Sequence, residues 1–180
     1  MDCIHPRKDV NLVSMAGDEV RFPALQTKSI QATLFNTGMS LKAQKEGFTK
    51  LAVASDYANL VEGGLATTND RIKQSPEKMF RFIRAALKGL NFFVVKREQS
   101  IKYMTDALRM NDRELVNAIY DIQSKLVLRE GFTDDKVLQS MIDEMKKTTK
   151  VQRDIKISDI FDLTFVKKAN EELKVAGWKP

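Results

Sequence analysis

Two short polar turns carry the residue types best suited to binding a small ligand. The turn "AGD" at 16–18 follows the apolar stretch 9–15, and "NTG" at 36–38 follows the apolar stretch 30–35. Each turn precedes a helix-like segment, whose first backbone N–H groups would be free to attract a carboxylate, sulfonate or phosphate. The alternative is that Asp18 and Thr37 only cap helices. The candidate residues from these turns are Gly17, Asp18, Asn36 and Thr37.

Catalytic and metal chemistry find little support in the residue pattern. The sequence has one cysteine and one histidine, Cys3 and His5, beside a proline and without a second cluster of ligands. Phosphate-loop, dinucleotide-binding, zinc-protease and CxxC motifs are missing. The neighbouring carboxylates at 134–135 and 143–144 are typical of charged helix faces. We therefore expect no enzyme activity, no metal and no cofactor.

The first 70 residues predict an alternation of strands and helices. Apolar runs at 9–15, 30–35, 48–54 and 63–67 are expected strands, and the segments 19–28 and 38–46 are expected helices. Asp18 is expected to cap the first helix, and Gly47 to end the second in the left-handed conformation. Strand, helix, strand with short connections is typical of a parallel α/β sheet. Ligands of such sheets bind beyond the carboxyl ends of the strands, where both polar turns are expected.

The residues after 70 predict helices. Ser75 and Pro76 mark the start of a long amphipathic helix, because serine is a good cap and proline fits the first helical position. Further helices are expected at 98–109, from Asn111, from Thr133 and near the end of the chain.

Charge and hydropathy limit the classes of partner. The net charge is +6, and the excess lies in residues 71–180, where lysine and arginine alternate with acidic residues. Such interspersed charges are typical of solvated helix faces rather than of a basic stripe that follows phosphates, so we expect no nucleic-acid binding. No stretch reaches the roughly 20 apolar residues of a membrane span. The start, "MDCIHPRKDV", lacks the apolar core of a signal peptide.

The order of these segments resembles a known family. "DVNLVSMAGDEVRFPALQTKSIQATLFNTGMSLKAQKEGFTKLA" at 9–52 resembles the second lobe of ABC-transporter solute-binding proteins of the nitrate/sulfonate/taurine type, relatives of the pyrimidine-precursor synthases of thiamine biosynthesis. The likeness lies in the strand, small-residue turn and helix ending in "ALQ", and in the later "EGF". The segment "GGLATTND" at 63–70 is similar to the family's crossover between lobes, and 75–93 to the long helix after it.

The resemblance implies a type II periplasmic-binding-protein-like fold, with one partial α/β lobe at 1–70 and a helical region at 71–180 that packs on the first lobe. It implies a solute-binding component of an ABC transport system, periplasmic or extracytoplasmic, which captures a small polar or anionic molecule for a membrane permease. Gly64 joins the candidate ligand residues by its place in the crossover. A sensory or interaction domain of the same fold is the alternative. The synthase signature rich in cysteine is missing, which argues against that enzyme.

The sequence departs from the resemblance in its extent. It starts where the second lobe of the family is already under way, so no first-lobe core is expected in it. In the family, the helices after the crossover pack on that first lobe. The apolar face formed by Phe80, Ile83, Leu87 and Leu90 is therefore expected to be uncovered, and to make a homodimer unless the chain is a fragment.

Overall fold

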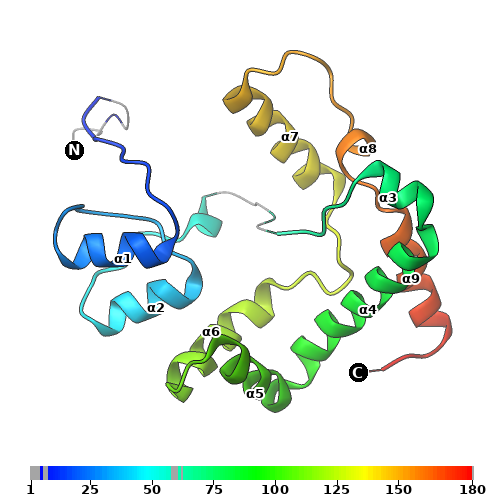
Figure 1. Ribbon diagram of the computed structural model, residues 1–180, viewed down its shortest axis with the longest axis horizontal. Helices are drawn as coiled ribbons and strands as arrows, with labels where there is room; N and C mark the ends of the chain where they lie inside the picture. The colour runs from blue at the N-terminus through cyan, green and yellow to red at the C-terminus, as the bar shows by residue number, and fades with distance from the viewer. Residues whose placement is uncertain (1–4, 6–7, 58–60, 62, 180) are drawn as a thin grey trace. The chain divides into compact units, whose positions relative to one another are not determined.

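A computed structural model describes residues 5, 8–57, 61 and 63–179. The described residues form helices and coil (Figure 1). The helices are α1 Asp18–Gln26, α2 Thr37–Lys45, the 3-10 turn η1 Ala54–Asp56, α3 Asn69–Gln74, α4 Pro76–Val95, α5 Arg97–Leu108, α6 Arg113–Leu126, α7 Asp135–Thr149, α8 Ile157–Ile160 and α9 Thr164–Val175. The chain divides into two compact units, Met1–Lys50 and Leu51–Pro180, called unit 1 and unit 2 below.

The four predicted strands are not formed among the described residues. The segments 9–15, 30–35, 48–53 and 63–67 are coil or bends, and residue 54 begins the η1 turn. A strand exists only when its backbone pairs with a neighbouring strand, and these segments have no such partner. The expected α/β lobe is therefore not seen, although the apolar runs that suggested it are real.

Unit 1 is held together by three aromatic rings around α1. The Phe22 ring centroid on α1 lies 5.9 Å from that of Phe35 and 6.2 Å from that of Phe48, both edge to face. Lys42 on α2 places its ammonium 5.0 Å from the centre of the Phe22 ring. Phe22 is consequently buried, and the coil segments before and after α2 are fixed against one face of α1.

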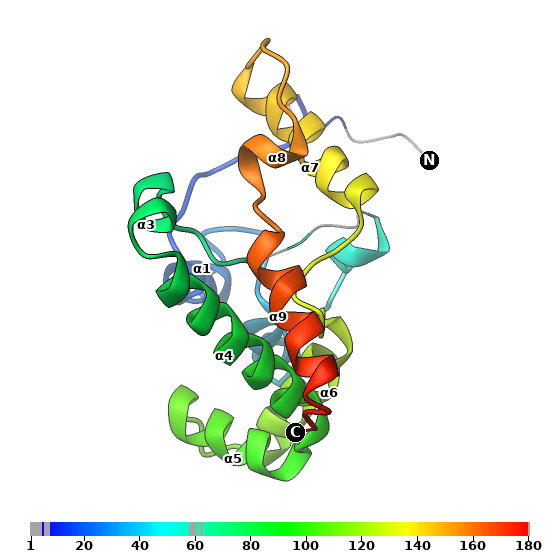
Figure 2. The ribbon, with the colours of Figure 1, turned by 90° about the vertical axis from the view of Figure 1, so that its right-hand side faces the viewer.

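The main core of unit 2 lies between α4 and α9. Figure 2 shows the two helices running side by side. The buried members of this core are Phe80, Leu87, Val166, Ala169 and Leu173. Ile83 and Leu90 on α4 and Trp178 after α9 pack at its border. Their spacing on each helix brings the apolar residues onto one stripe, which the other helix covers.

This core corrects the prediction that the face of Phe80, Ile83, Leu87 and Leu90 is uncovered. Phe80 and Leu87 are buried by α9 of the same chain. The ammonium of Lys168 on α9 also lies 4.7 Å from the centre of the Phe80 ring. The homodimer was inferred from exposure of this face, so its premise is wrong.

A second, smaller core joins α4, α5 and α6 around Tyr120. Its buried members are Ile101, Val116 and Tyr120, and Phe93 packs against them. The Tyr120 hydroxyl donates to the carbonyl oxygens of Phe93 and Val94, at 2.9 and 3.0 Å. The Arg97 guanidinium stacks over the same ring and contacts Asp121, whose hydrogen bond raises the pKa of Arg97. These contacts fasten α6 to the end of α4.

The loop between α6 and α7 crosses the α4–α9 core and is tied to both helices. The amide of Asn91 on α4 donates to the carbonyl of Arg129 and accepts from its guanidinium, both at 3.0 Å. Asn170 on α9 donates to the carbonyl of Glu130 at 2.8 Å. Between these ties, Gly131 adopts φ +73°. The loop therefore closes one end of the core with the backbone of Gly131 and the side chain of Phe132.

Helix starts differ from the predictions by about one residue. Gly17 is the N-cap of α1, so Asp18 is its first residue rather than its cap. Asp112 caps α6 in place of Asn111, and Asp134 caps α7 in place of Thr133. In both corrected cases the carboxylate accepts from the backbone N–H three residues on, which a neighbouring asparagine or threonine would do equally well.

Other local expectations are confirmed. Pro76 is the first residue of α4, and Gly47 has φ +90° after α2. The chain's division at 50/51 differs from the predicted boundary at 70/71, and the ligand-binding lobe at 1–70 stays a prediction. Among the described residues, no helix is both long and apolar enough to cross a bilayer.

Candidate functional site

The turn before α1 places a carboxylate at the start of the helix. The Gly17 carbonyl accepts from the backbone N–H groups of Val20 and Arg21, at 3.0 and 3.2 Å, which closes the first turn. The Asp18 side chain is only 14% exposed, and its two oxygens have different partners. Oδ2 accepts from the backbone N–H of Asn36 at 3.1 Å, and Oδ1 lies 3.8 Å from the guanidinium of Arg21.

The turn before α2 is built by Asn36. Its Oδ1 accepts from the backbone N–H of Met39 at 2.9 Å, which caps α2, and its own carbonyl accepts from Ser40 at 2.9 Å. Thr37 is the first residue of α2 and is half-buried. The Asn36 side-chain amide NH₂ and the Thr37 hydroxyl take part in none of the hydrogen bonds of the described residues, so both are available to a ligand.

The structure brings Gly17, Asp18, Asn36 and Thr37 together, although the parallel strands from which their meeting was expected are not formed. The 3.1 Å hydrogen bond between the Asn36 N–H and Asp18 joins residues 18 positions apart in the sequence. The start of α1 and the start of α2 therefore lie at one place in unit 1. The expected caps, Asp18 and Thr37, are instead the first residues of α1 and α2, whose N-caps are Gly17 and Asn36. The role of these residues in ligand binding stays a prediction.

Arg21 is the member of this site that sequence reasoning missed. Its guanidinium donates to the carbonyl of Leu34 at 3.3 Å and to that of Met15 at 3.4 Å, in addition to its contact with Asp18. One side chain thus contacts the carboxyl ends of two coil segments, 9–15 and 30–35. The available signal was its position three residues after Asp18, which puts the two side chains on one face of the helix.

The charges at the two helix starts are unequal. The first turn of α1 carries Asp18 and Glu19, whereas the first turn of α2 carries no acidic residue. The first N–H groups of α2, the Asn36 NH₂ and the Thr37 hydroxyl are all groups that can donate a hydrogen bond to a ligand. Arg21 adds a positive charge and is about one third exposed. The first turn of α2 by itself therefore favours an anionic group. The carboxylate of Asp18, which accepts from the Asn36 N–H, adds a negative charge at the same place and faces the charge of Arg21.

Gly64 belongs to unit 2 and lies in exposed coil before α3. The predicted role of Gly64 in the ligand site with Gly17, Asp18, Asn36 and Thr37 stays a prediction. Cys3 lies outside the described residues. His5 is exposed, and its backbone N–H donates to Asp9 at 2.7 Å.

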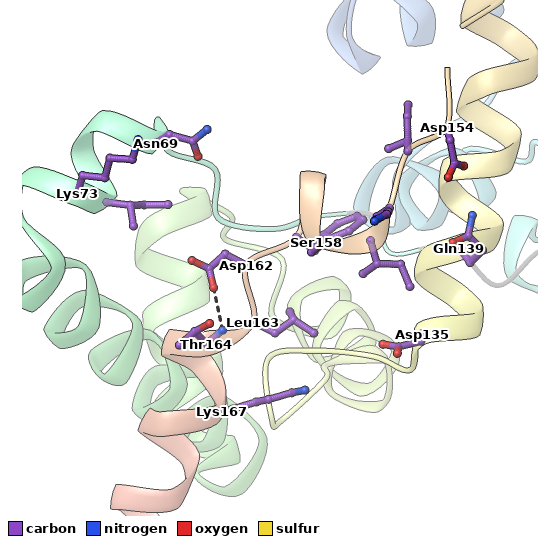
Figure 3. A pocket seen from close by; sticks show the side chains of 15 residues that line it. Asn69, Lys73, Asp135, Gln139, Asp154, Ser158, Asp162, Leu163, Thr164 and Lys167 are labelled. Carbon is purple, nitrogen blue, oxygen red and sulfur yellow. Dashed lines mark hydrogen bonds between the residues drawn. The ribbon is translucent and has the colours of Figure 1, made fainter. Parts of the chain in front are cut away.

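Unit 2 has an open hollow of about 810 Å³ between α3, α7, α8 and the start of α9 (Figure 3). Sequence reasoning proposed none of its lining residues as ligand residues, and it interpreted Asp135 as part of a charged helix face. Its charged side chains are Lys73, Lys156 and Lys167 and the carboxylates Asp135, Asp154 and Asp162. Asp162 accepts from the backbone N–H of Thr164 at 2.9 Å, as Figure 3 shows, so it serves the start of α9. The balanced charges favour no particular ligand.

A family model described as NMT1/THI5 like matches residues 5–100, which is more than half of the chain and includes both polar turns. The chain belongs to the NMT1/THI5-like family. The likeness to nitrate/sulfonate/taurine-type binding proteins, drawn above from the sequence, is thereby confirmed.

One curated relative of this NMT1/THI5-like chain comes from Bacillus subtilis (strain 168) and is named "Putative aliphatic sulfonates-binding protein". The two are 23% identical over 173 residues, which cover 94% of this chain and 51% of the relative. The chain thus spans about half the length of this relative. No solved structure matches the chain.

Proposed function

We propose that the chain is a solute-binding component of an ABC-type transport system that captures a small organic anion, an aliphatic sulfonate, without changing it chemically. Its family and the name of its Bacillus subtilis relative support this class of solute. By the same reasoning it acts outside the cytoplasm and delivers its solute to a membrane permease.

The observation that carries the proposal is the meeting of the two turns. Because the Asn36 N–H is held by Asp18, the start of α2 is fixed beside Arg21 within unit 1. A sulfonate has three acceptor oxygens and no donor. The donors that remain at the start of α2 match this pattern, namely the backbone N–H groups of Thr37 and Gly38, the Asn36 NH₂ and the Thr37 hydroxyl.

A titration calorimeter tests the choice of solute directly. Ethanesulfonate is compared with ethylamine, which has a similar size and the opposite charge, and with ethanol, which is neutral. We expect heat of binding with ethanesulfonate alone, and a rise in melting temperature in its presence. At a hundredfold excess over Kd, binding to the folded state adds about 2.7 kcal/mol to the free energy of unfolding. Binding of ethylamine instead would overturn the proposal.

The variant Asn36→Asp separates binding from folding. Aspartate caps helices about as well as asparagine, so the free energy of unfolding is expected to change little. The aspartate side chain has no NH₂ donor, and its negative charge repels an anion. The affinity for ethanesulfonate is therefore expected to fall by about tenfold or more, or about 1.4 kcal/mol.

The matched control is Asp134→Asn, an exchange between the same two residue types at the cap of α7 in unit 2. It should leave the affinity for ethanesulfonate unchanged. Equal losses in Asn36→Asp and Asp134→Asn would show that the effect arises from general destabilisation rather than from this site.

A further inference from the structure

Helix α4 has a second face, opposite the one that α9 covers. Its positions 78, 82, 85, 89 and 92 recur at three- and four-residue spacing, so they form one stripe along the helix. The buried Phe80 and Leu87 lie on the other side. On the second stripe Phe82 is 57% exposed, and a Cβ added at Gly89 would meet no atom within 4 Å. Within the described residues, the middle of this stripe is therefore uncovered.

Aromatic rings stand at both ends of the stripe. Phe82 and Phe92 are ten positions apart, which corresponds to about 15 Å along an α-helix. The Phe92 ring centroid lies 6.3 Å from that of Tyr103 on α5, and Tyr103 is 65% exposed. Both residue types present a large apolar surface, and a tyrosine hydroxyl can stay in water. The surface called the outer face below consists of Lys78, Arg81, Phe82, Gly89, Phe92 and Tyr103.

The charges of α4 have mostly one sign. The helix carries four basic residues, Lys78, Arg81, Arg84 and Lys88, and one acidic residue, Glu77. Helix α6 carries two basic and two acidic residues, and α7 carries three of each. The alternation of signs expected for residues 71–180 therefore holds for α6 and α7 but not for α4. Basic residues beside exposed aromatic residues on one helix are typical of binding to a membrane surface.

Two of these basic residues have no ionic partner. Arg84 contacts Glu172 on α9 at 2.7 Å, and the Lys88 ammonium lies 5.5 Å from the centre of the indole ring that follows α9. Both therefore serve the contact between α4 and the end of the chain. Lys78 and Arg81 are exposed and form no ion pair with any described residue. An apolar protein surface over the outer face would bury both charges without a partner, which is unfavourable.

We propose that the outer face docks on the surface of an anionic lipid bilayer. Phe82, Phe92 and Tyr103 enter the interfacial region, where their apolar surfaces leave water and the tyrosine hydroxyl stays hydrated. Lys78 and Arg81 bind the phosphate groups of the lipids, so both charges gain partners without being buried in an apolar core. This complementarity of charge favours a bilayer over an apolar protein surface. The proposal concerns unit 2 and does not depend on the solute proposed for unit 1.

Sedimentation with lipid vesicles tests the docking, with the full chain and without any sulfonate. Vesicles of equal parts phosphatidylglycerol and phosphatidylcholine are compared with vesicles of phosphatidylcholine alone. We expect at least tenfold tighter binding to the anionic vesicles, because each basic residue near an anionic surface strengthens binding about fivefold. Binding should weaken in about 0.5 M salt, because salt screens the charges.

Two double variants locate the contact. Lys78→Gln with Arg81→Gln removes both unpaired charges of the outer face and is expected to weaken binding to the anionic vesicles by tenfold or more. Lys125→Gln with Lys136→Gln is the matched control, because it removes the same net charge from exposed residues of α6 and α7. The control should bind nearly as tightly as the parent chain. All four side chains are exposed, so both variants should keep the helical circular dichroism of the parent chain.

Phe82→Ser separates insertion of the ring from attraction of charge. It leaves the net charge unchanged and is expected to weaken binding to the anionic vesicles by about tenfold, because the ring no longer leaves water there. Leu126→Ser on α6 is the matched control, since Leu126 is 59% exposed, close to Phe82, and lies outside the outer face. An unchanged affinity in Phe82→Ser would contradict the insertion.

Three further results would overturn the proposal. The first is no binding to the anionic vesicles at low salt. The second is equal weakening in the two double variants, which would trace binding to the net charge of +6 rather than to the outer face. The third is a light-scattering mass of two chains for the parent and of one chain for Phe82→Ser, because a second copy would then cover the outer face. Asn36→Asp is expected to bind the vesicles like the parent chain, which keeps this test separate from that of the proposed solute.

Discussion

Arg21 connects the candidate solute site to the coil segments 9–15 and 30–35 of unit 1. Arg21→Met removes the hydrogen bonds to Met15 and Leu34 and the charge beside Asp18. Because the guanidinium is partly exposed and both bonds are long, we expect a loss of about 1 kcal/mol in the free energy of unfolding. Exchange of the Asn36 amide should also accelerate.

Arg21→Lys distinguishes geometry from charge. One ammonium cannot span two carbonyl groups in the way that a planar guanidinium does, so lysine is expected to restore little of the loss. Full recovery with lysine would mean that charge alone fixes the turns.

Ser100 on α5 is a buried side chain whose removal should help the protein. It is buried, and its hydroxyl has no hydrogen-bond partner in the described structure. A buried polar group without a partner costs about 1–3 kcal/mol. Ser100→Ala is therefore expected to raise the midpoint of chemical denaturation. A lower midpoint would show that the hydroxyl has a partner in solution, such as a bound water.

The sequence allowed prediction of the turn residues but not of what joins them. Asn36 was predicted because a polar residue between an apolar run and a helix is a local signal. Arg21 contacts residues 6 and 13 positions away, and such contacts depend on how the chain returns after α1. Local sequence patterns do not show where the chain runs after α1, and so they do not predict these contacts.

The loop between α6 and α7 requires glycine at position 131. An added Cβ would lie 2.8 Å from Leu87 Cδ2 and 3.1 Å from Val166 Cγ2, and φ is +73°. Leu87 is buried between helices and cannot give way easily. We expect Gly131→Ala to lower the free energy of unfolding by about 2–4 kcal/mol, from the backbone strain and the overpacked core together. Chemical denaturation of the variant and of the parent chain measures this loss in the free energy of unfolding.

Gly47 provides the control for backbone strain. It also has a positive φ, +90°, but an added Cβ would meet no atom within 4 Å. Gly47→Ala should therefore cost only about 1–2 kcal/mol, the price of the left-handed conformation alone. Equal losses at the two glycines would contradict the proposed contact of the loop with the core.

Helices were predicted better than strands because the interactions that form a helix join residues that are close in the sequence. The start of α4 follows from Pro76 and from apolar residues at helical spacing, and each backbone N–H of a helix bonds four residues back. The segment 30–35 has the apolar run that predicts a strand, but a strand needs a partner that no local pattern supplies. Its prediction failed for that reason.

The stability of unit 2 is concentrated where α4 meets α9. Leu87→Ala would leave a cavity among buried residues of both helices, and such changes cost about 2–5 kcal/mol. We expect a matching loss in chemical denaturation, with faster amide exchange in α4 and α9. Exchange in α1 and α2, which belong to unit 1, should stay as in the parent chain. Faster exchange in both units would mean that they unfold together.

The prediction of a homodimer rested on the apolar face of α4 considered without the rest of the chain. The apolar stripe of α4 was correct, but its cover lies some 80 residues later, at Val166, Ala169 and Leu173 of α9. These residues also recur at helical spacing, so the signal for a second stripe was present. Which two stripes meet is a property of the whole chain, and the loop at Gly131 helps to decide it.

Trp178, the only tryptophan in the sequence, packs at the border of the α4–α9 core with the ammonium of Lys88 5.5 Å from its ring. Its intrinsic fluorescence is therefore a probe of unit 2. Emission will shift when α9 leaves α4 and water reaches the indole. The same signal is blind to melting of unit 1, whose three packed rings are phenylalanines. A single fluorescence transition would not show that the whole chain unfolds in one step.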